Sequence, residues 1–293
     1  MLATLIAVFG IINPVFLKTS NLLNILSQNS IIGIVSLGMT LVIIIGGIDL
    51  SVGSLVAFTS MLFAILVSNG VPLFVAILIS IISGICFGFI NGVLIIKGKI
   101  PAFIATLGMM SAARGLTLLL SGSKSVSLGN SSVNSIVNFS IGGIAVSSFV
   151  FIALTIILFL FLKKTYWGKY LYAIGGNEKA AFFNGIDISK FTILAYSIGG
   201  LMCGFASILL VGSLNSAQPQ AGQLYELTAI AAVVIGGASL SGGKGSILGT
   251  FVGVLILGVI QNGLSILNVP SYYQYILVGI IIIISVLVDK KFN

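Results

Sequence analysis

The sequence contains no histidine and only five aspartate or glutamate residues among 293. A histidine-based metal site, histidine acid–base catalysis and a Ser-His-Asp triad are therefore excluded. The only cysteines, Cys86 and Cys203, both lie within apolar segments, where they are expected as small buried residues and not as a disulfide. We predict no metal site and no catalytic residue in this chain.

Charge is also scarce, since only 6% of the residues are charged and 58% are hydrophobic. With a mean hydropathy of +1.25, a water-soluble fold would lack the polar residues to cover its surface. Apolar runs of bilayer-spanning length recur along the whole chain, which predicts an all-α polytopic membrane protein. The net charge of +8 is interpreted as a signal of membrane topology and not of nucleic-acid binding.

We expect about ten transmembrane helices in a single domain covering residues 1–293. The predicted spans are 2–17, 29–46, 51–68, 72–96, 100–121, 144–163, 191–212, 225–240, 245–267 and 272–288. Glycine-rich breaks shorten the third and the eighth. The first has no basic segment before it, so we interpret it as a membrane helix and not a signal peptide, and we expect the natural start of the chain upstream.

The lysines orient these spans. If both termini are cytoplasmic, the outer connections hold only Lys18 and Lys124, and this asymmetry satisfies the positive-inside rule. The ten lysines of the cytoplasmic connections are Lys97, Lys99, Lys163, Lys164, Lys169, Lys179, Lys190, Lys244, Lys290 and Lys291. The outer connection 121–140 is rich in serine and asparagine, and it is either a docking surface for an extracytoplasmic partner or a solvated connector.

Seven of the eighteen charged residues lie in one cytoplasmic loop, at about 163–190. Within it Asn177 is a suitable N-cap, Glu178 suits the first turn, and Gly185 provides a left-handed stop. We therefore predict a short, water-facing helix that exposes two phenylalanines. Such an apolar surface needs a cover, which is either the lipid headgroups or a groove in another protein.

The stretch IIIGGIDLSVGS breaks an apolar run at Gly46-Gly47, and either Asp49 or Ser51 can cap the helix that follows. A related pattern, VIGGASLSGGKGS, occurs at 234–246. Paired glycine-interrupted segments in the two halves of a membrane protein point to a translocation pathway. The alternative is that both segments are ordinary cytoplasmic hairpins.

Polar residues inside spans are costly, so each is a functional hypothesis. Arg114 either snorkels outward or pairs with Glu226, and structural pairing is preferred to substrate contact. Asn91 and Asn262 either join helices or face a polar cargo, and helix packing is preferred. The tentative pathway residues are Asp49, Ser51, Asn91, Arg114, Glu226 and Asn262.

The sequence GGKGS at 242–246 is not a phosphate-binding loop. The pattern G-x-x-x-x-G-K-[ST] requires glycine where this chain has Ala238, and serine or threonine where it has Gly245. We predict that the chain binds no nucleotide itself.

Five long motifs occur in order along the chain. They are SLGMTLVIIIGGIDLSVGSLVAF, IPAFIATLGMMSAARGL, WGKYLYAIGGNEKAAFFNGIDISKFTILAYSIGG, SAQPQAGQLYELTAIAAVVIGGASLSGGKGSILGTFVG and NGLSILNVPSYYQYILVGIIIIISVLVD. Together they resemble the permease subunits of bacterial ABC sugar importers of the ribose type, over nearly the whole chain. The likeness is greatest to ribose permeases, with xylose, galactose and autoinducer-2 permeases near by. Thr228 departs from the family, whose members commonly carry an acidic residue there.

The resemblance implies the membrane-spanning subunit of an ATP-binding-cassette importer in the bacterial plasma (inner) membrane. It would move a monosaccharide, with ribose as the expected cargo, by alternating access. The implied partners are a second permease subunit in a homodimer, a cytoplasmic ATPase that binds ATP and Mg, and an extracytoplasmic sugar-binding protein. The alternatives are a permease of the same class for another sugar or autoinducer-2, and a secondary transporter. The loop at 163–190 would be the coupling loop, with Gly175, Gly176, Asn177, Glu178, Ala180, Ala181, Gly185 and Ile186 as its ATPase-coupling residues.

Overall fold

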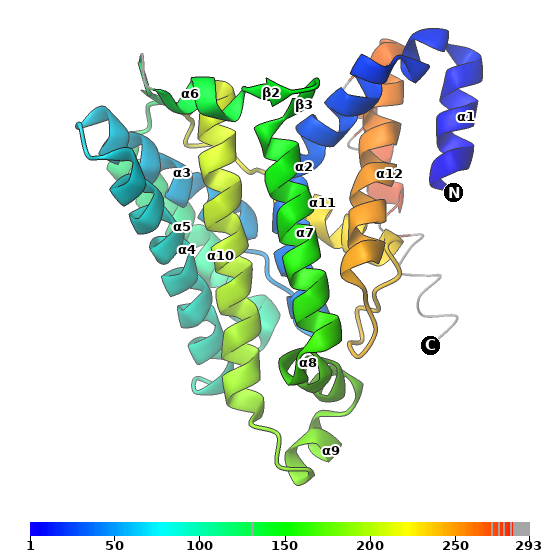
Figure 1. Ribbon diagram of the computed structural model, residues 1–293. Helices are drawn as coiled ribbons and strands as arrows, with labels where there is room; N and C mark the ends of the chain where they lie inside the picture. The colour runs from blue at the N-terminus through cyan, green and yellow to red at the C-terminus, as the bar shows by residue number, and fades with distance from the viewer. Residues whose placement is uncertain (130–131, 271, 275, 278, 282, 284–293) are drawn as a thin grey trace.

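The computed structural model describes residues 1–129 and 132–270, together with 272–274, 276–277, 279–281 and 283. These residues form a bundle of helices with short strands at one end (Figure 1). The helices are α1 (Leu2–Ile12), η1 (Pro14–Leu17), α2 (Thr19–Ile44), α3 (Val52–Ser68), α4 (Leu73–Ile96), α5 (Ala102–Ser121), α6 (Ser132–Val137), α7 (Val146–Lys164), α8 (Tyr166–Gly176), α9 (Glu178–Phe183), α10 (Ile188–Leu214), α11 (Tyr225–Ile235) and α12 (Ile247–Ile266). The strands are β1 (Val126–Ser127), β2 (Ser140–Ile141), β3 (Ile144–Ala145) and β4 (Ser216–Ala217).

Six of the described helices, namely α2, α4, α5, α7, α10 and α12, are long and apolar enough to cross a membrane. Shorter apolar helices cover Leu2–Ile12, Val52–Ser68, Tyr225–Ile235 and Tyr272–Ile281. The prediction of an all-α polytopic membrane protein is confirmed, and the third and eighth predicted spans are indeed short. The tenth predicted span, 272–288, extends beyond the described residues.

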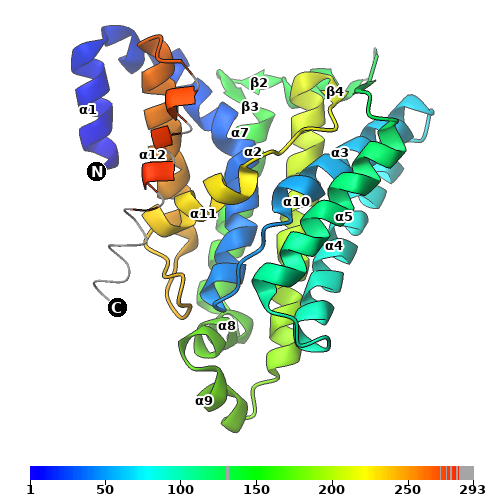
Figure 2. The same ribbon diagram turned by 180° about the vertical axis from the view of Figure 1, so that it is seen from behind.

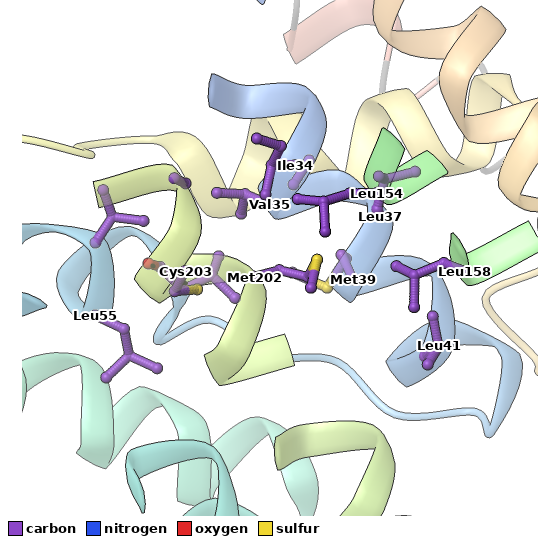
Figure 3. Close-up of a cluster of buried hydrophobic side chains, with 14 of the residues drawn as sticks. Ile34, Val35, Leu37, Met39, Leu41, Leu55, Leu154, Leu158, Met202 and Cys203 are labelled. Carbon is purple, nitrogen blue, oxygen red and sulfur yellow. Dashed lines mark hydrogen bonds between the residues drawn. The ribbon is translucent and has the colours of Figure 1, made fainter. Parts of the chain in front are cut away.

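The helix α2 lies at the centre of the bundle, and every residue from Gly33 to Ile44 is buried. A helix that is apolar on all faces has to be enclosed, and α7, α10, α11 and α12 pack around this one. Figure 3 shows Leu154 and Leu158 of α7, and Met202 and Cys203 of α10, converging on the α2 residues between Ile34 and Leu41. The α4 and α5 helices lie outside this core and carry many exposed large apolar side chains.

Small residues bring α4 and α10 into backbone contact. Gly84 and Gly88 of α4 lie one turn apart, and a Cβ added at Gly84 would meet the carbonyl of Gly200 on α10. Close packing of this kind holds helices together in lipid, where the hydrophobic effect between helices is lost. It fixes α10 as a wall of the bundle, and α10 carries residues that border the site described below.

The two ends of the bundle differ in charge. The connections α4–α5, α7–α8, α9–α10 and α11–α12 lie at one end, and α6 with the β2–β3 hairpin lies at the other (Figure 1). The first end, counted with α8, α9 and the helix turns that flank these connections, carries eight of the ten lysines predicted to be cytoplasmic, and the other two, Lys290 and Lys291, lie outside the described residues. The segregation of lysines to one end is confirmed. The cytoplasmic position of both termini stays a prediction.

The first predicted span is wrong in its extent. The helix α1 ends at Ile12, and Asn13 caps the separate turn η1 by accepting a hydrogen bond from the N–H of Val15. At about 1.5 Å per residue, the eleven residues of α1 reach only about half of the hydrocarbon thickness. The predicted connection before residue 29 is instead the first part of α2, because its polar side chains find partners within the bundle.

The outer connection 121–140 is more structured than the predicted connector. The strand β1 pairs antiparallel with β4, and β2 pairs with β3 in a hairpin. The amide of Asn134 on α6 donates to the carbonyl of Gly212 at the end of α10, 2.9 Å away. A docking role for this surface stays a prediction.

Candidate functional site

The break between α2 and α3 is built inside the bundle. Gly46 adopts a left-handed φ of +79°, which ends α2, and the chain then rises again to the start of α3 (Figure 2). Asp49 and Ser51 lie on this rising segment, and both are fully buried. The Asp49 Oδ1 atom accepts hydrogen bonds from the Ser51 N–H at 2.8 Å and from the Ser51 hydroxyl at 2.6 Å. Irregular backbone of this kind is stable at membrane depth only where protein encloses it.

Side chains from three neighbouring helices hold this segment in place. The amide of Asn91 on α4 donates to the Ser51 hydroxyl at 2.9 Å, so Asp49, Ser51 and Asn91 form one buried network. Thr106 of α5 and Tyr196 of α10 both donate to the Ile48 carbonyl, at 3.2 and 3.4 Å. Either Asp49 or Ser51 was expected to cap α3. Ser51 occupies the N-cap position, but within the described part of the chain α3 has no side-chain capping hydrogen bond, because the Ser51 hydroxyl donates to Asp49 and Asp49 accepts from Ser51 itself.

Two acceptors in the network, Asp49 Oδ2 and Asn91 Oδ1, have no hydrogen-bond partner among the described residues. An unpaired buried oxygen costs about 1–3 kcal/mol. The segment is therefore held in position by its neighbours, although these two buried oxygens of the network are not hydrogen-bonded to any residue that the structure describes.

A cavity of about 470 Å³ lies beyond the broken segment, between the first turn of α3, α5 and the start of α11. Its volume is typical of small-molecule sites. Its lining is mixed, with hydroxyl, amide, guanidinium and carboxylate groups beside apolar surface. The lining residues are Ser54, Met110, Ser111, Arg114, Gln223, Leu224 and Glu226. These are groups that hydrogen-bond to a small polyhydroxyl compound.

The structure brings Arg114 and Glu226 to this one cavity, but it corrects the predicted pairing. The Arg114 guanidinium donates to the carbonyls of Pro219 and Ala221, at 2.6 and 2.9 Å, and not to the Glu226 carboxylate. The reason is the loop before α11, which runs from β4 to α11 (Figure 2) and brings the carbonyls of Pro219 and Ala221 within reach of the guanidinium. Arg114 therefore shapes the cavity by holding that loop, and Glu226 faces the cavity from the first turn of α11.

Asn262 lies in a different part of the molecule. Its amide and that of Asn21 on α2 exchange two hydrogen bonds, of 2.9 and 3.1 Å, which tie α12 to the beginning of α2. The preferred interpretation of Asn262 as a packing residue agrees with this geometry. The same interpretation of Asn91 also agrees with its geometry, because its amide joins α4 to Ser51, the N-cap residue of α3.

The predicted helix of the charged loop is present as α9, and its local structure is confirmed. The Asn177 Oδ1 atom accepts from the N–H of Ala180 at 2.9 Å, and Gly185 ends the helix with a φ of +78°. Phe182 and Phe183 are 65% and 84% exposed, whereas Ala181 is buried. An open hollow of about 730 Å³ lies beside the two aromatic rings. The helix thus projects an apolar surface beyond the end of the bundle (Figure 1).

The sequence reasoning missed the helix α8, which precedes α9 and packs beneath α7. Its N-cap is Thr165, whose hydroxyl accepts from the N–H of Gly168 at 3.3 Å. The hydroxyl of Tyr172 donates to the carbonyl of Gly245 at 2.8 Å, and burial raises the pKa of Tyr172 above its usual value. The Thr165-Tyr-Trp-Gly start and the spacing of Leu171 and Ile174 were signals that could have revealed this helix.

Ser54, Ser111 and Gln223 also line the cavity without having been predicted. A serine in a membrane helix is common as a packing residue, so these positions carried no sequence signal of their own. Within the described residues, no group of three or more histidine, cysteine, aspartate or glutamate side chains could hold a metal ion.

Comparison with known proteins identifies the family. Residues 21–286 match the family described as "Branched-chain amino acid transport system / permease component". The chain is 46% identical to the ribose import permease of Bacillus subtilis (strain 168) over 291 residues, covering 98% of this chain and 90% of that protein. It is 44% identical to the ribose import permease of Escherichia coli (strain K12), with 99% and 92% covered. It is also 38% identical to the D-allose transport system permease of the same strain, with 99% and 90% covered.

No solved structure matches the chain. The family match spans most of the sequence, and its members are transport components of the membrane and not catalysts. The chain belongs to the permease-component family of the branched-chain amino acid transport system type, and it is a multi-pass membrane permease.

Proposed function

We propose that this chain is the membrane-spanning subunit of an ATP-driven ribose importer in the bacterial inner membrane. Ribose as cargo is supported by the relatives, since the ribose permeases are 42–46% identical to this chain over nearly its full length. The permeases for allose and fructose are 38% and 36% identical. Although the family description refers to branched-chain amino acids, the cavity with Arg114, Glu226 and Gln223 offers polar groups of the kind that bind hydroxyls.

The exposed surface of α9 is the single observation that carries the ATP-driven mechanism. Phe182 and Phe183 are adjacent and largely exposed, and an exposed apolar patch at the end of the molecule indicates a surface that a partner covers. The proposed partner is a cytoplasmic ATPase, which binds ATP and Mg and hydrolyses the nucleotide outside this chain. Gly175 to Ile186 form the proposed coupling segment, in which the exposed residues of α9 make the contact and Gly175 joins α9 to the bundle. Closure of the ATPase moves α9, and two permease copies then change the side to which the pathway opens.

A second copy of the chain and an extracytoplasmic sugar-binding protein complete the proposed assembly. The cavity at Arg114 is open on one side and bordered by α5, whose outer surface is apolar. A homodimer would place two such cavities on one path. The binding protein would deliver sugar to the end that carries α6 and the β2–β3 hairpin.

The test is ATP-dependent uptake of radiolabelled ribose by proteoliposomes that contain the chain, its ATPase and its binding protein. The matched variant is Gly185→Arg, because Gly185 has a left-handed φ that arginine adopts only at a cost and lies next to the exposed face of α9. We expect this variant to insert into the membrane normally, to lose co-purification with the ATPase, and to lose uptake. Normal uptake by the variant would contradict the coupling role.

Uptake without ATP by the chain alone would favour a secondary transporter. Competition with unlabelled allose, xylose, galactose and autoinducer-2 separates ribose from the other cargoes of this class. Stronger competition by any one of these than by ribose would replace ribose in the proposal and leave the ATP-driven mechanism unaffected.

A further inference from the structure

Glycines from three distant segments meet at the end of the bundle next to α8. Gly46 follows α2, Gly175 lies in the last turn of α8, and Gly242 and Gly243 lie between α11 and α12. A Cβ added at Gly242 would lie 2.8 Å from the Gly175 carbonyl and 2.9 Å from the Gly46 nitrogen. A Cβ added at Gly175 would overlap the Ile44 carbonyl. We call this contact of Gly46, Gly175, Gly242 and Gly243 the glycine joint.

The joint is a contact of backbone with backbone. The N–H of Gly243 donates to the carbonyl of Ile44 at 2.8 Å, which links the α11–α12 connection to the end of α2. Side chains at a helix contact change rotamer and absorb small movements, whereas backbone atoms in contact cannot. A shift of α8 at Gly175 is therefore transmitted to the ends of α2 and α11 with little loss.

The glycine joint also lies next to the start of α9 in the sequence. Gly175 is two residues before Asn177, the N-cap of α9. Only Gly176 separates them, so a displacement of α9 also displaces Gly175. The hydroxyl bond from Tyr172 to Gly245 fastens α8 to the α11–α12 connection one turn earlier. The end of α8 and that connection therefore form one unit.

The segment that leaves the joint reaches the cavity. Residues 45–54 run from the end of α2 through the Asp49 network to α3, where Ser54 lines the cavity. Gly53 packs against the start of α11, and a Cβ added at Gly53 would lie 2.6 Å from the Glu226 carboxylate. A crevice of about 170 Å³, lined by Gly46, Gly47, Glu178 and Tyr196 among others, leaves room for the segment to move.

We propose that the glycine joint is the point at which movement of α9 is transferred to residues 45–54, and hence to the cavity at Ser54 and Glu226. Gly175 is the positioning residue of this transfer. The proposal rests on the proposed function, since it requires an ATPase on α9 and a cargo at the cavity. It goes further by naming the contact that links ATP hydrolysis to transport, namely a continuous chain of packed backbone atoms.

The test is Gly175→Ala, with Gly279→Ala as the matched control. Gly279 lies in the last described helix, and a Cβ there would meet no atom of the described residues within 4 Å. Three quantities are measured in proteoliposomes with the ATPase and the binding protein: ATPase binding, ATP hydrolysis and ribose uptake. We expect Gly175→Ala to keep ATPase binding but to lower the number of sugars moved per ATP roughly 2- to 30-fold, the range seen for residues that couple distant sites. The control should keep the wild-type ratio.

A second variant covers the case in which Gly175→Ala fails to fold. Tyr172→Phe adds no atom and removes only the hydrogen bond to Gly245, and we expect it to lower the same ratio about 2- to 10-fold. If either folded variant moves the wild-type number of sugars per ATP, the proposed role of the glycine joint is wrong, while the proposed function is unaffected. A wild-type chain that binds no ATPase would overturn the proposed function, and the joint with it.

Discussion

The N-cap of α9 offers a quantitative test of the coupling surface. The Asn177 side chain accepts one hydrogen bond, from the N–H of Ala180 at 2.9 Å, and this bond is exposed to water. The helix has six residues and buries only Ala181, so neither its length nor its packing stabilises it strongly. We expect Asn177→Ala to destabilise α9 by about 1 kcal/mol, within a range of about 0.5–2 kcal/mol.

This cost changes the affinity for the ATPase, because docking requires the ordered helix. A free energy of 1 kcal/mol corresponds to about a fivefold change in an equilibrium constant, since about 1.4 kcal/mol corresponds to tenfold. The apparent affinity falls in proportion to the population of the competent conformation. We therefore expect the Kd of the ATPase for the detergent-purified Asn177→Ala permease to rise up to about fivefold.

The control is Asn177→Asp, which keeps an oxygen acceptor at the N-cap and adds a favourable negative charge at the helix N-terminus. Its Kd should remain within about twofold of the wild-type value. The assay is titration of the purified ATPase against each variant, with the melting temperature of the permease as a check on folding. An unchanged Kd in Asn177→Ala, or an equal loss in both variants, would refute the role assigned to the cap.

Three further outcomes follow from the site. Arg114→Met removes charge-assisted hydrogen bonds to two loop carbonyls, at about 1.5–3 kcal/mol each, and should lower the thermal midpoint in detergent, with Arg114→Lys recovering part of the loss. Asp49→Asn places an amide donor beside the unpaired Asn91 oxygen, so it should keep or raise stability while ribose uptake falls; full uptake would favour the hairpin interpretation. Asn262→Leu breaks the amide pair with Asn21 and should cost about 1 kcal/mol of stability, without changing uptake per folded molecule; a raised KM for ribose would contradict a packing role.

The features that the sequence predicted well are local ones. The boundaries of α4, α5 and α12 lie within two residues of the predicted spans, because the length of an apolar run decides how a segment crosses a bilayer. The caps of α9 were predicted because an asparagine and a glycine act on backbone groups only a few residues away. The glycine break before Asp49 was visible for the same reason.

The parts that the sequence could not reveal depend on contacts between distant residues. Asn91 meets Ser51 across 40 positions, and Arg114 meets the 219–221 loop across more than 100. The charge of Arg114 suggested Glu226 as its partner, but the 219–221 loop offers two carbonyls within reach of the guanidinium. Polar residues at the start of α2 indicated a loop, and only a partner such as Asn262 makes a helix stable there.

The sequence by itself thus determined that the chain crosses the membrane, which end holds its positive charge, and where α9 begins and ends, because hydrophobicity, charge and capping act over a few residues. The tertiary structure alone decided which polar groups share a cavity, and that Gly46, Gly175 and Gly242 touch. A glycine has no side chain from which its contact partner could be predicted, so its role becomes visible only where another backbone packs against it.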